Sequence, residues 1–207
     1  MSVSAVRQRQ WLLALLVFAC GLVMVSFWLR HSAHQEEAKS RALAADLAAD
    51  HAQSLQRGIE RALSATYAIA ALVRQGRGFV NDFNGVATQM LPFYPGISAL
   101  GLSPGGVICC VVPRAGNENS IGFNQLEDIV QNKEARRARD TRKLTLAGPV
   151  QLAQGGLGVV GRLPIYLGQG DDTQVFWGFS YVTLRFPQAL ESARLEMLRD
   201  RGYAYEL

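Results

Sequence analysis

Residues 144–186 read LTLAGPVQLAQGGLGVVGRLPIYLGQGDDTQVFWGFSYVTLRF, and they contain the clearest evidence for the fold. It contains three apolar runs rich in Val, Ile, Leu and aromatic residues, which is typical of β-strands. Short stretches rich in Gly, Gln and Asp separate the runs and predict turns. Upstream, the apolar runs ISALGL and VICCVV flank Ser103-Pro104-Gly105-Gly106, which predicts a β-hairpin. The sequence therefore predicts an antiparallel sheet of five strands.

Helices separate and flank these strands. We expect a short amphipathic helix at Phe79–Leu91, a second at Gln125–Thr141, and a last one that Pro187 opens. Helices around an antiparallel sheet define the α+β class, and this order of elements has a PAS-like outline. The final apolar run starts at Tyr203 and has no room to finish, which predicts a C-terminally incomplete domain.

A long helical stretch precedes the sheet. Residues 30–77 contain no proline and are rich in good helix formers, so we predict a helical stalk that Gly76 and Gly78 end. Its apolar residues recur at helical spacing and form one stripe: Leu43, Leu47, Leu55, Ile59, Leu63 and Tyr67. For the distal half of this stripe two partners stay open, a second copy of the chain or the domain that follows.

The N-terminal segment predicts a membrane anchor. Residues 11–29 read WLLALLVFACGLVMVSFWL and carry no charge, and as a helix they would span about 28 Å, close to the thickness of the bilayer hydrocarbon. Arg7 and Arg9 precede them, so the positive-inside rule makes residues 1–10 a cytoplasmic tail. A cleaved signal ending near Ala33 fits less well because the apolar core is too long. A lipoprotein site at Cys20 fits less well because cleavage would leave an apolar tail.

Composition excludes several classes of protein. Of the 207 residues, 49% are hydrophobic and 18% are charged, which excludes a disordered chain, and three Cys exclude a disulfide scaffold. The net charge is +4, but the basic residues do not form a tail, so we predict no nucleic-acid partner. All three His lie in the stalk, so neither a catalytic triad nor a clustered metal site can form in the domain. We predict no catalytic residue, no metal and no cofactor, and hence no enzyme.

A succession of short motifs runs between Val111 and Leu167. In order, they are Pro113, Asn117-Glu118, Gly122, Ala138-Arg139-Asp140-Thr141, Gly148-Pro149, Gly155-Gly156 and Arg162-Leu163-Pro164-Ile165-Tyr166. In this order they resemble the core of a CHASE domain, and the resemblance makes residues 78–207 a CHASE-like sensory domain. CHASE domains are extracytoplasmic sensory modules of histidine kinases, diguanylate cyclases and phosphodiesterases. In plant relatives a carboxylate recognises the adenine of cytokinin, but residues 109–112 are non-acidic, so cytokinin is not carried over.

Arg162 is the most informative candidate site residue, because it lies in an otherwise apolar strand. A buried guanidinium must be paired, so Arg162 is either a structural partner of Asp140 or Glu127, or a clamp for a ligand. We predict Arg162, Tyr166 and Arg139 as ligand-binding residues.

Three other patterns have two interpretations each. The adjacent Cys109 and Cys110 are either two buried small residues or a redox sensor. The basic run from Lys133 to Lys143 is either a solvated surface or a contact for anions or lipid head groups. The glycines at 155, 156 and 158 fit a hairpin turn better than a phosphate loop, because no Lys-Ser or Lys-Thr follows.

Together these features predict a membrane-anchored, extracytoplasmic signal-sensing domain. We expect the N-terminal part of a bacterial transmembrane receptor for cyclic-di-GMP or two-component signalling, with an unknown small-molecule ligand. Its location would be the inner membrane, with a single pass, a cytoplasmic N-terminus and a periplasmic domain, and the stalk helix would form a homodimer. The alternative is a single-pass structural or assembly protein that binds only protein partners.

Overall fold

The computed structural model describes residues 3–129, 132–168 and 173–193. The chain divides into two units, Met1–Asp50 and His51–Leu207. In the first unit the described residues are helical and belong to α1 (Val3–Gln75). Within the part of the chain that the structure describes, no helix is long and apolar enough to cross a membrane. The transmembrane segment at residues 11–29 stays a prediction.

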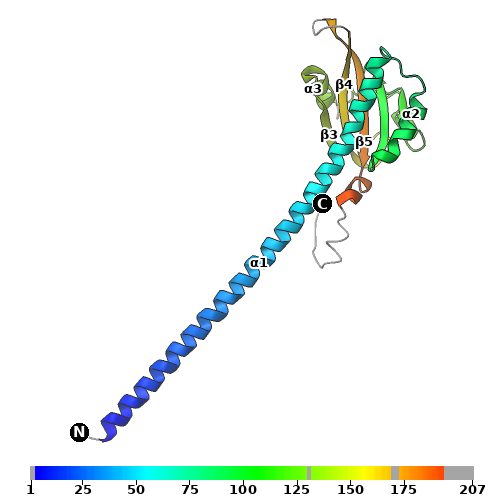
Figure 1. Cartoon of the computed structure of the whole chain (residues 1–207). Helices are drawn as coiled ribbons and strands as arrows, with labels where there is room; N and C mark the ends of the chain where they lie inside the picture. Colours follow the sequence, from blue (N-terminus) through cyan, green and yellow to red (C-terminus); the bar gives the residue numbers. More distant parts are fainter. Residues whose placement is uncertain (1–2, 130–131, 169–172, 194–207) are drawn as a thin grey trace. The chain divides into compact units, whose positions relative to one another are not determined.

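One five-stranded sheet forms the centre of the second unit (Figure 1). Its strands are β1 (Ile97–Pro104), β2 (Cys110–Val112), β3 (Thr145–Gln151), β4 (Leu157–Leu167) and β5 (Val175–Arg185). The spatial order is β2-β1-β5-β4-β3, and every neighbouring pair is antiparallel. The predicted α+β class, the β1–β2 hairpin and the glycine turn between β3 and β4 are therefore confirmed.

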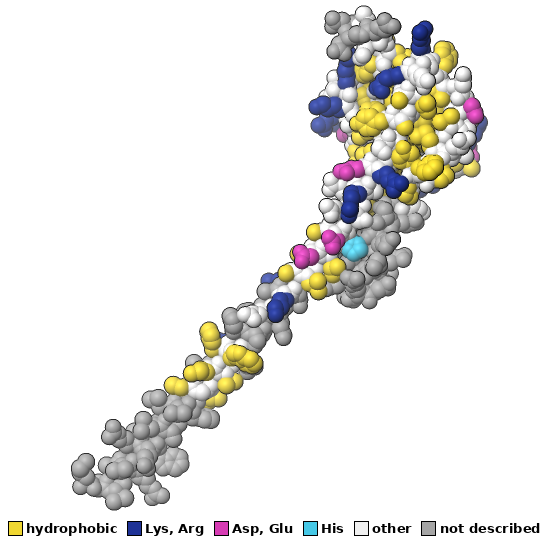
Figure 2. Space-filling model, viewed as in Figure 1, with side chains coloured by type: hydrophobic (Ala, Val, Ile, Leu, Met, Phe, Trp, Pro, Cys, Tyr) yellow, Lys and Arg dark blue, Asp and Glu magenta, His cyan; other side chains and the backbone are white. Residues whose placement is uncertain are grey.

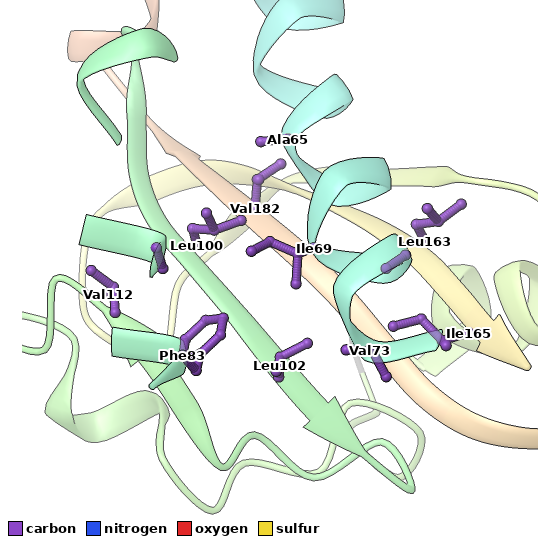
Figure 3. Packing of buried hydrophobic residues seen from close by; sticks show 12 residues of the cluster. Ala65, Ile69, Val73, Phe83, Leu100, Leu102, Val112, Leu163, Ile165 and Val182 are labelled. Carbon is purple, nitrogen blue, oxygen red and sulfur yellow. The ribbon is translucent and has the colours of Figure 1, made fainter. Parts of the chain in front are cut away.

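The last turns of α1 cover one face of this sheet. Figure 3 shows Ala65, Ile69 and Val73 of α1 beside side chains of β1, β4 and β5, and all three are fully buried. The Ser180 hydroxyl of β5 donates a hydrogen bond of 2.8 Å to the backbone carbonyl of Thr66, which ties the helix to the central strand. Burial of this apolar helix face removes nonpolar surface from water, which is the main source of stability.

The sequence at Gly76 to Gly78 ends α1 as predicted. Arg77 has a φ of 52°, the left-handed conformation that commonly follows a helix. Its N–H bonds to the Arg74 carbonyl at 3.1 Å, and the Gly78 N–H bonds to the Val73 carbonyl at 2.8 Å. This pair of bonds satisfies two of the carbonyls that a helix end leaves without partners.

The distal part of the predicted stalk belongs to the domain. The second unit starts at His51, ahead of the boundary predicted at residue 78. Of the two partners left open for the distal half of the stripe, the last turns of α1 therefore pack on the domain that follows. The sequence places Tyr67 in the apolar stripe, but its side chain is 55% exposed, and Thr66 and Ile69 are buried instead. The helix turns a face of small residues, Ala62, Ala65 and Ala70, to the sheet and so approaches it closely.

Three predicted helices differ from the structure. The first, α2 (Phe83–Met90), begins four residues late because the Asp82 carboxylate caps it by accepting from the Gly85 N–H at 3.0 Å. The second, α3 (Asn132–Thr141), does not start at Gln125, since residues 124–128 form turns. The third is a 3-10 helix, η4 (Gln188–Ala193), and the rest of that prediction, with the strand predicted from Tyr203, lies outside the described residues.

The other face of the sheet is covered by the segment between β2 and β3. The short 3-10 helix η2 (Glu118–Ser120) belongs to this segment. A second one, η1 (Leu91–Phe93), lies between α2 and β1. Ala135 and Ala138 of α3 are fully buried against Phe179 of β5. Because side chains alternate along a strand, β4 and β5 present one set of residues to α1 and the other set to this segment.

Candidate ligand-binding cleft

A cleft lies on the sheet face that points away from α1. Its free interior is small, about 20 Å³, which is room for about one water molecule, within an empty volume of about 310 Å³ that includes open solvent. Residues of β4 and β5 form its floor. Its walls come from the connection between β1 and β2, the connection between β2 and α3, and the turn between β3 and β4. The polar lining consists of Ser120, Gln125, Gln154, Arg162, Tyr181 and Thr183, and the larger apolar residues are Ile108, Phe123, Leu152 and Val160.

Arg162 lies in the floor of the cleft and is 1% exposed. It is paired across the sheet with Tyr181 of β5 and Thr145 of β3. Its Nε donates to the Gln125 Oε1, which fixes the plane of the guanidinium. Burial lowers the pKa of Arg162 from 12.5 to about 10, and the negative charges of Glu134 and Asp128 act in the opposite direction. The side chain is therefore a buried cation at neutral pH.

Gln125 links the cleft floor to the β1 strand. Its Nε2 donates to the Ser103 hydroxyl at 2.9 Å, and Gln125 itself is 1% exposed. The Ser103 hydroxyl donates in turn to the Phe179 carbonyl at 3.4 Å. A chain of buried hydrogen bonds of this kind holds the guanidinium in one position.

Tyr181 is the second buried polar side chain of the floor. Its side chain is 2% exposed, and burial raises its pKa above the ordinary value of 10.0. The nearby Ser120 hydroxyl lowers this pKa in part, but Ser120 donates its own hydrogen bond to the Asn117 carbonyl at 2.6 Å. Among the described residues, the Tyr181 hydroxyl has no hydrogen-bond partner. A buried hydroxyl without a partner costs free energy, so it needs an explanation.

Gly101 makes room for the Tyr181 ring. The two residues face each other across β1 and β5, and a Cβ on Gly101 would lie 2.5 Å from two ring atoms of Tyr181. The same Cβ would lie 2.5 Å from the Cys110 carbonyl oxygen. Only glycine fits here while the Tyr181 ring keeps this position.

The structure places the other two predicted ligand residues outside the cleft. The Tyr166 hydroxyl donates to the Arg139 backbone carbonyl, so these residues meet at the end of α3. The Arg139 side chain is 39% exposed and its Nε lies 2.8 Å from Asp140 Oδ1. Asp140 therefore pairs with Arg139, and Glu134 and Asp128 are the carboxylates that act on Arg162. The structure does not bring Arg162, Tyr166 and Arg139 together in one site.

Tyr166 instead borders a wider hollow at the end of β4. This hollow has an empty volume of about 700 Å³, open solvent included, and Arg74, Arg142 and Gln174 also line it. The Arg142 guanidinium lies 4.5 Å above the Tyr166 ring and donates to the Gln174 side chain at 3.0 Å. The hollow has more free room than the cleft, but Tyr166, Arg142 and Gln174 are bound to one another, so it is the weaker candidate for polar recognition of a ligand. Figure 2 shows basic side chains gathered along the edge of the domain that carries α3, which fits a solvated surface.

The comparisons with known proteins agree with this architecture. The CHASE domain family matches residues 98–204, just over half of the chain. The chain belongs to the CHASE domain family. CHASE domains are sensory rather than catalytic, so this chain carries the sensory domain of an extracytoplasmic family. The resemblance that the sequence motifs suggested is confirmed.

One solved structure has the same fold as this CHASE chain. It is described as an extracellular ligand binding receptor from Desulfohalobium retbaense, is 18% identical, and superposes with a TM-score of 0.56 over 72% of this chain. The match covers 26% of the receptor, so the chain spans about a quarter of its length. At this identity the similarity concerns the fold alone. Among curated proteins none matches the chain.

Sequence reasoning missed most of the cleft of this CHASE domain. Arg162 could be found because a charge interrupts an apolar strand, but Tyr181 and Thr183 are ordinary strand residues by composition. Their positions two residues apart in β5 put them on one face, and that spacing was the only available signal. Gln125 was assigned to a helix, and nothing in the sequence indicates that its side chain reaches Arg162.

Proposed function

We propose that this chain is an extracytoplasmic sensor whose cleft binds a small molecule. The single observation that supports it best is the buried Tyr181 hydroxyl, which lacks a partner among the described residues and lies in the cleft beside the buried cation Arg162. Both groups are donors. The ligand would therefore carry a hydrogen-bond acceptor such as a carboxylate or a carbonyl. The apolar walls would bind its hydrocarbon part, and because the free interior is about 20 Å³, a wall would move outward to admit more than a few atoms.

The proposal includes a membrane anchor and a signalling partner. Residues 11–29 would be a single transmembrane helix, with residues 1–10 in the cytoplasm and the domain in the periplasm. The stalk would pair with the stalk of a second copy. The uninterrupted helix and its apolar stripe support this pairing. The CHASE family occurs in receptors that control cyclic-di-GMP turnover or two-component kinases, so we place this chain in the N-terminal part of such a receptor. A ligand would act only through its different affinities for two arrangements of the domain.

Thermal-shift screening of the full chain in detergent tests the ligand proposal. The probes are small carboxylates, each paired with a neutral isostere. A ligand at a hundred times its Kd stabilises a folded protein by about 2.7 kcal/mol, which raises the Tm by on the order of 5–10 °C. We expect such a shift with at least one carboxylate, and a much smaller one with its isostere.

Variants then assign the binding to the cleft. In Tyr181→Phe and in Arg162→Met, at least ten times more carboxylate should be needed to produce the same Tm shift. In Arg139→Gln, which lies outside the cleft, the required concentration should not change. Because Arg162→Met removes a buried cation, its Tm without ligand is measured first. Equal shifts in Tyr181→Phe and the unaltered chain would contradict the assignment. Stabilisation by a protein partner alone would support the assembly-protein alternative instead.

A further inference from the structure

The two cysteines next to the cleft lie in contact with each other. The Sγ atoms of Cys109 and Cys110 are 2.7 Å apart, and Cys109 Sγ also lies 3.7 Å from the Leu102 carbonyl oxygen. Adjacent residues of a regular strand point to opposite faces. Here β2 starts only at Cys110, and the irregular backbone before it allows both thiols to turn to the same side.

This pair of thiols is also accessible. Cys109 is exposed and Cys110 is intermediate in exposure. The pKa of the Cys109 thiol is raised to about 12, by partial burial first and by its contact with Cys110 second. Cys109 therefore keeps its proton at neutral pH, and either thiol can be the donor in the contact between the two sulfurs. A dithiol in contact and within reach of solvent has the geometry for ring closure, unlike the two buried small residues of the alternative interpretation.

We propose that Cys109 and Cys110 form a redox-active dithiol that closes to an intrachain disulfide and thereby changes the wall of the ligand cleft. The oxidant is a second disulfide, either of a small molecule or of a thiol oxidase. One cysteine thiolate attacks a sulfur of this oxidant, whose other sulfur leaves as a thiolate. The second cysteine then displaces the remaining oxidant sulfur. Cys109 and Cys110 lose two protons and two electrons in total, and the oxidant becomes two thiols.

The closed form should open easily. Neighbouring Cα atoms across a trans peptide are about 3.8 Å apart, below the range of roughly 4.4–6.8 Å that disulfides prefer. A disulfide between adjacent residues is therefore strained, and strained, exposed disulfides are the readily reduced ones that serve regulation. Closure and opening would thus respond to the thiol–disulfide balance around the domain.

Ile108 connects the dithiol to the cleft. It directly precedes Cys109, it is 6% exposed, and its side chain lines the cleft. Its backbone bonds to the cleft wall in both directions, donating to the Phe123 carbonyl at 3.0 Å and accepting from the Gly122 N–H at 2.8 Å. Negative charge on either cysteine also raises the pKa of Tyr181, which shows that the cleft floor lies within electrostatic range. A change of backbone torsion at Cys109 therefore moves a residue of the wall.

The experiment uses the full chain with Cys20→Ser, so that no third thiol interferes. The protein is equilibrated with mixtures of reduced and oxidised glutathione, quenched in acid and alkylated. Trypsin should release residues 78–114, which contain both cysteines. We expect this peptide to be unalkylated and two hydrogen masses lighter than the dithiol after oxidation, and doubly alkylated after reduction. Full alkylation at every ratio, or glutathione adducts without the lighter peptide, would overturn the redox proposal.

Hydrogen–deuterium exchange measures the effect on the cleft separately. We expect residues 106–125 to exchange at different rates in the oxidised and reduced protein, with no difference in the Cys109→Ser/Cys110→Ser variant. Ring closure without any change in this segment would overturn the link to the wall. The redox step does not depend on the proposed ligand, so a failure in ligand screening leaves both measurements interpretable.

Discussion

At the scale of single residues, the Tyr181 hydroxyl is the most informative group. It is buried without a hydrogen-bond partner among the described residues, and a hydroxyl in that state destabilises the fold. A Phe at this position would keep the ring over Gly101 and avoid that cost. Without a partner the hydroxyl reduces stability, and the proposed ligand would supply the missing acceptor.

Tyr181→Phe should accordingly raise the free energy of unfolding by about 1 kcal/mol at neutral pH. Burial raises the pKa of Tyr181 above its unfolded value of 10.0, so the fold favours the protonated form. Below pH 10 Tyr181 is protonated in both the folded and the unfolded chain, so this contribution to stability is complete. As the pH rises beyond 10, the unfolded chain releases the proton first, and the contribution is lost. The variant should lose less stability between pH 10 and pH 12 than the unaltered chain.

Urea denaturation across this pH range measures the difference. The shifts of Cys109, raised to about 12, and of Arg162, lowered to about 10, also change stability in this range. Both groups remain in the variant, so the difference between the two proteins isolates Tyr181. Parallel curves at alkaline pH would contradict a buried, protonated tyrosine.

The same residue shows where sequence analysis reaches its limit. Arg162 was predicted as a site residue because burying a charge is costly wherever the strand lies. Tyr181 gave no such signal, since tyrosine is common in strands and only the tertiary structure determines whether its hydroxyl finds a partner. Tyr166 has the same chemistry as Tyr181, but its hydroxyl bonds to the Arg139 carbonyl and is thereby satisfied.

At the scale of elements, α1 contacts β4 through Leu63 and Gly161. Gly161 of β4 faces the helix, and a Cβ there would lie 2.1 Å from the Leu63 Cδ2. The helix approaches the strand closely because this strand residue has no side chain. Gly161→Ala should therefore destabilise the domain by about 1–2 kcal/mol through overpacking.

A double-mutant cycle with Leu63→Ala tests this contact. Leu63→Ala alone should cost about 2 kcal/mol, but it removes the atom that the new methyl group would meet. The double variant should then be more stable than the sum of the single changes predicts, by about 1 kcal/mol. Tyr67→Ala is the matched control, because Tyr67 is 55% exposed and should combine additively with Gly161→Ala. Additivity in both cycles would contradict the contact.

The elements themselves were largely predictable, and their packing was not. Hydrophobic runs and glycine turns identify the five strands, because both depend on local sequence. Helix starts were less accurate: α2 begins after the Asp82 cap, and α3 begins seven residues later than predicted, at Asn132 rather than Gln125. The insertion of β5 between β1 and β4 arises from long-range pairing, which no local pattern contains. The cleft depends on that order, so it could not be predicted.

At the scale of the whole molecule, the proposed topology makes the last prediction. Arg7 and Arg9 precede the apolar segment, and Arg30 follows it together with Glu36 and Glu37. Positive charge near a membrane helix favours the cytoplasmic side, so the domain should be exported. An alkaline phosphatase fused after Leu207 should then be active in bacterial cells, and a reporter that functions only in the cytoplasm should be inactive.

Charge variants make this topology test specific. Arg7→Ala/Arg9→Ala removes the positive charge that retains the N-terminus, so phosphatase activity should fall and cytoplasmic reporter activity should rise. Arg137→Ala/Arg139→Ala removes the same charge far from the apolar segment and should change neither reporter. An active cytoplasmic reporter with the unaltered sequence would contradict export. Export also matters for the dithiol, because disulfides persist outside the cytoplasm, where a reversible Cys109–Cys110 bond would report the redox state to which the cleft is exposed.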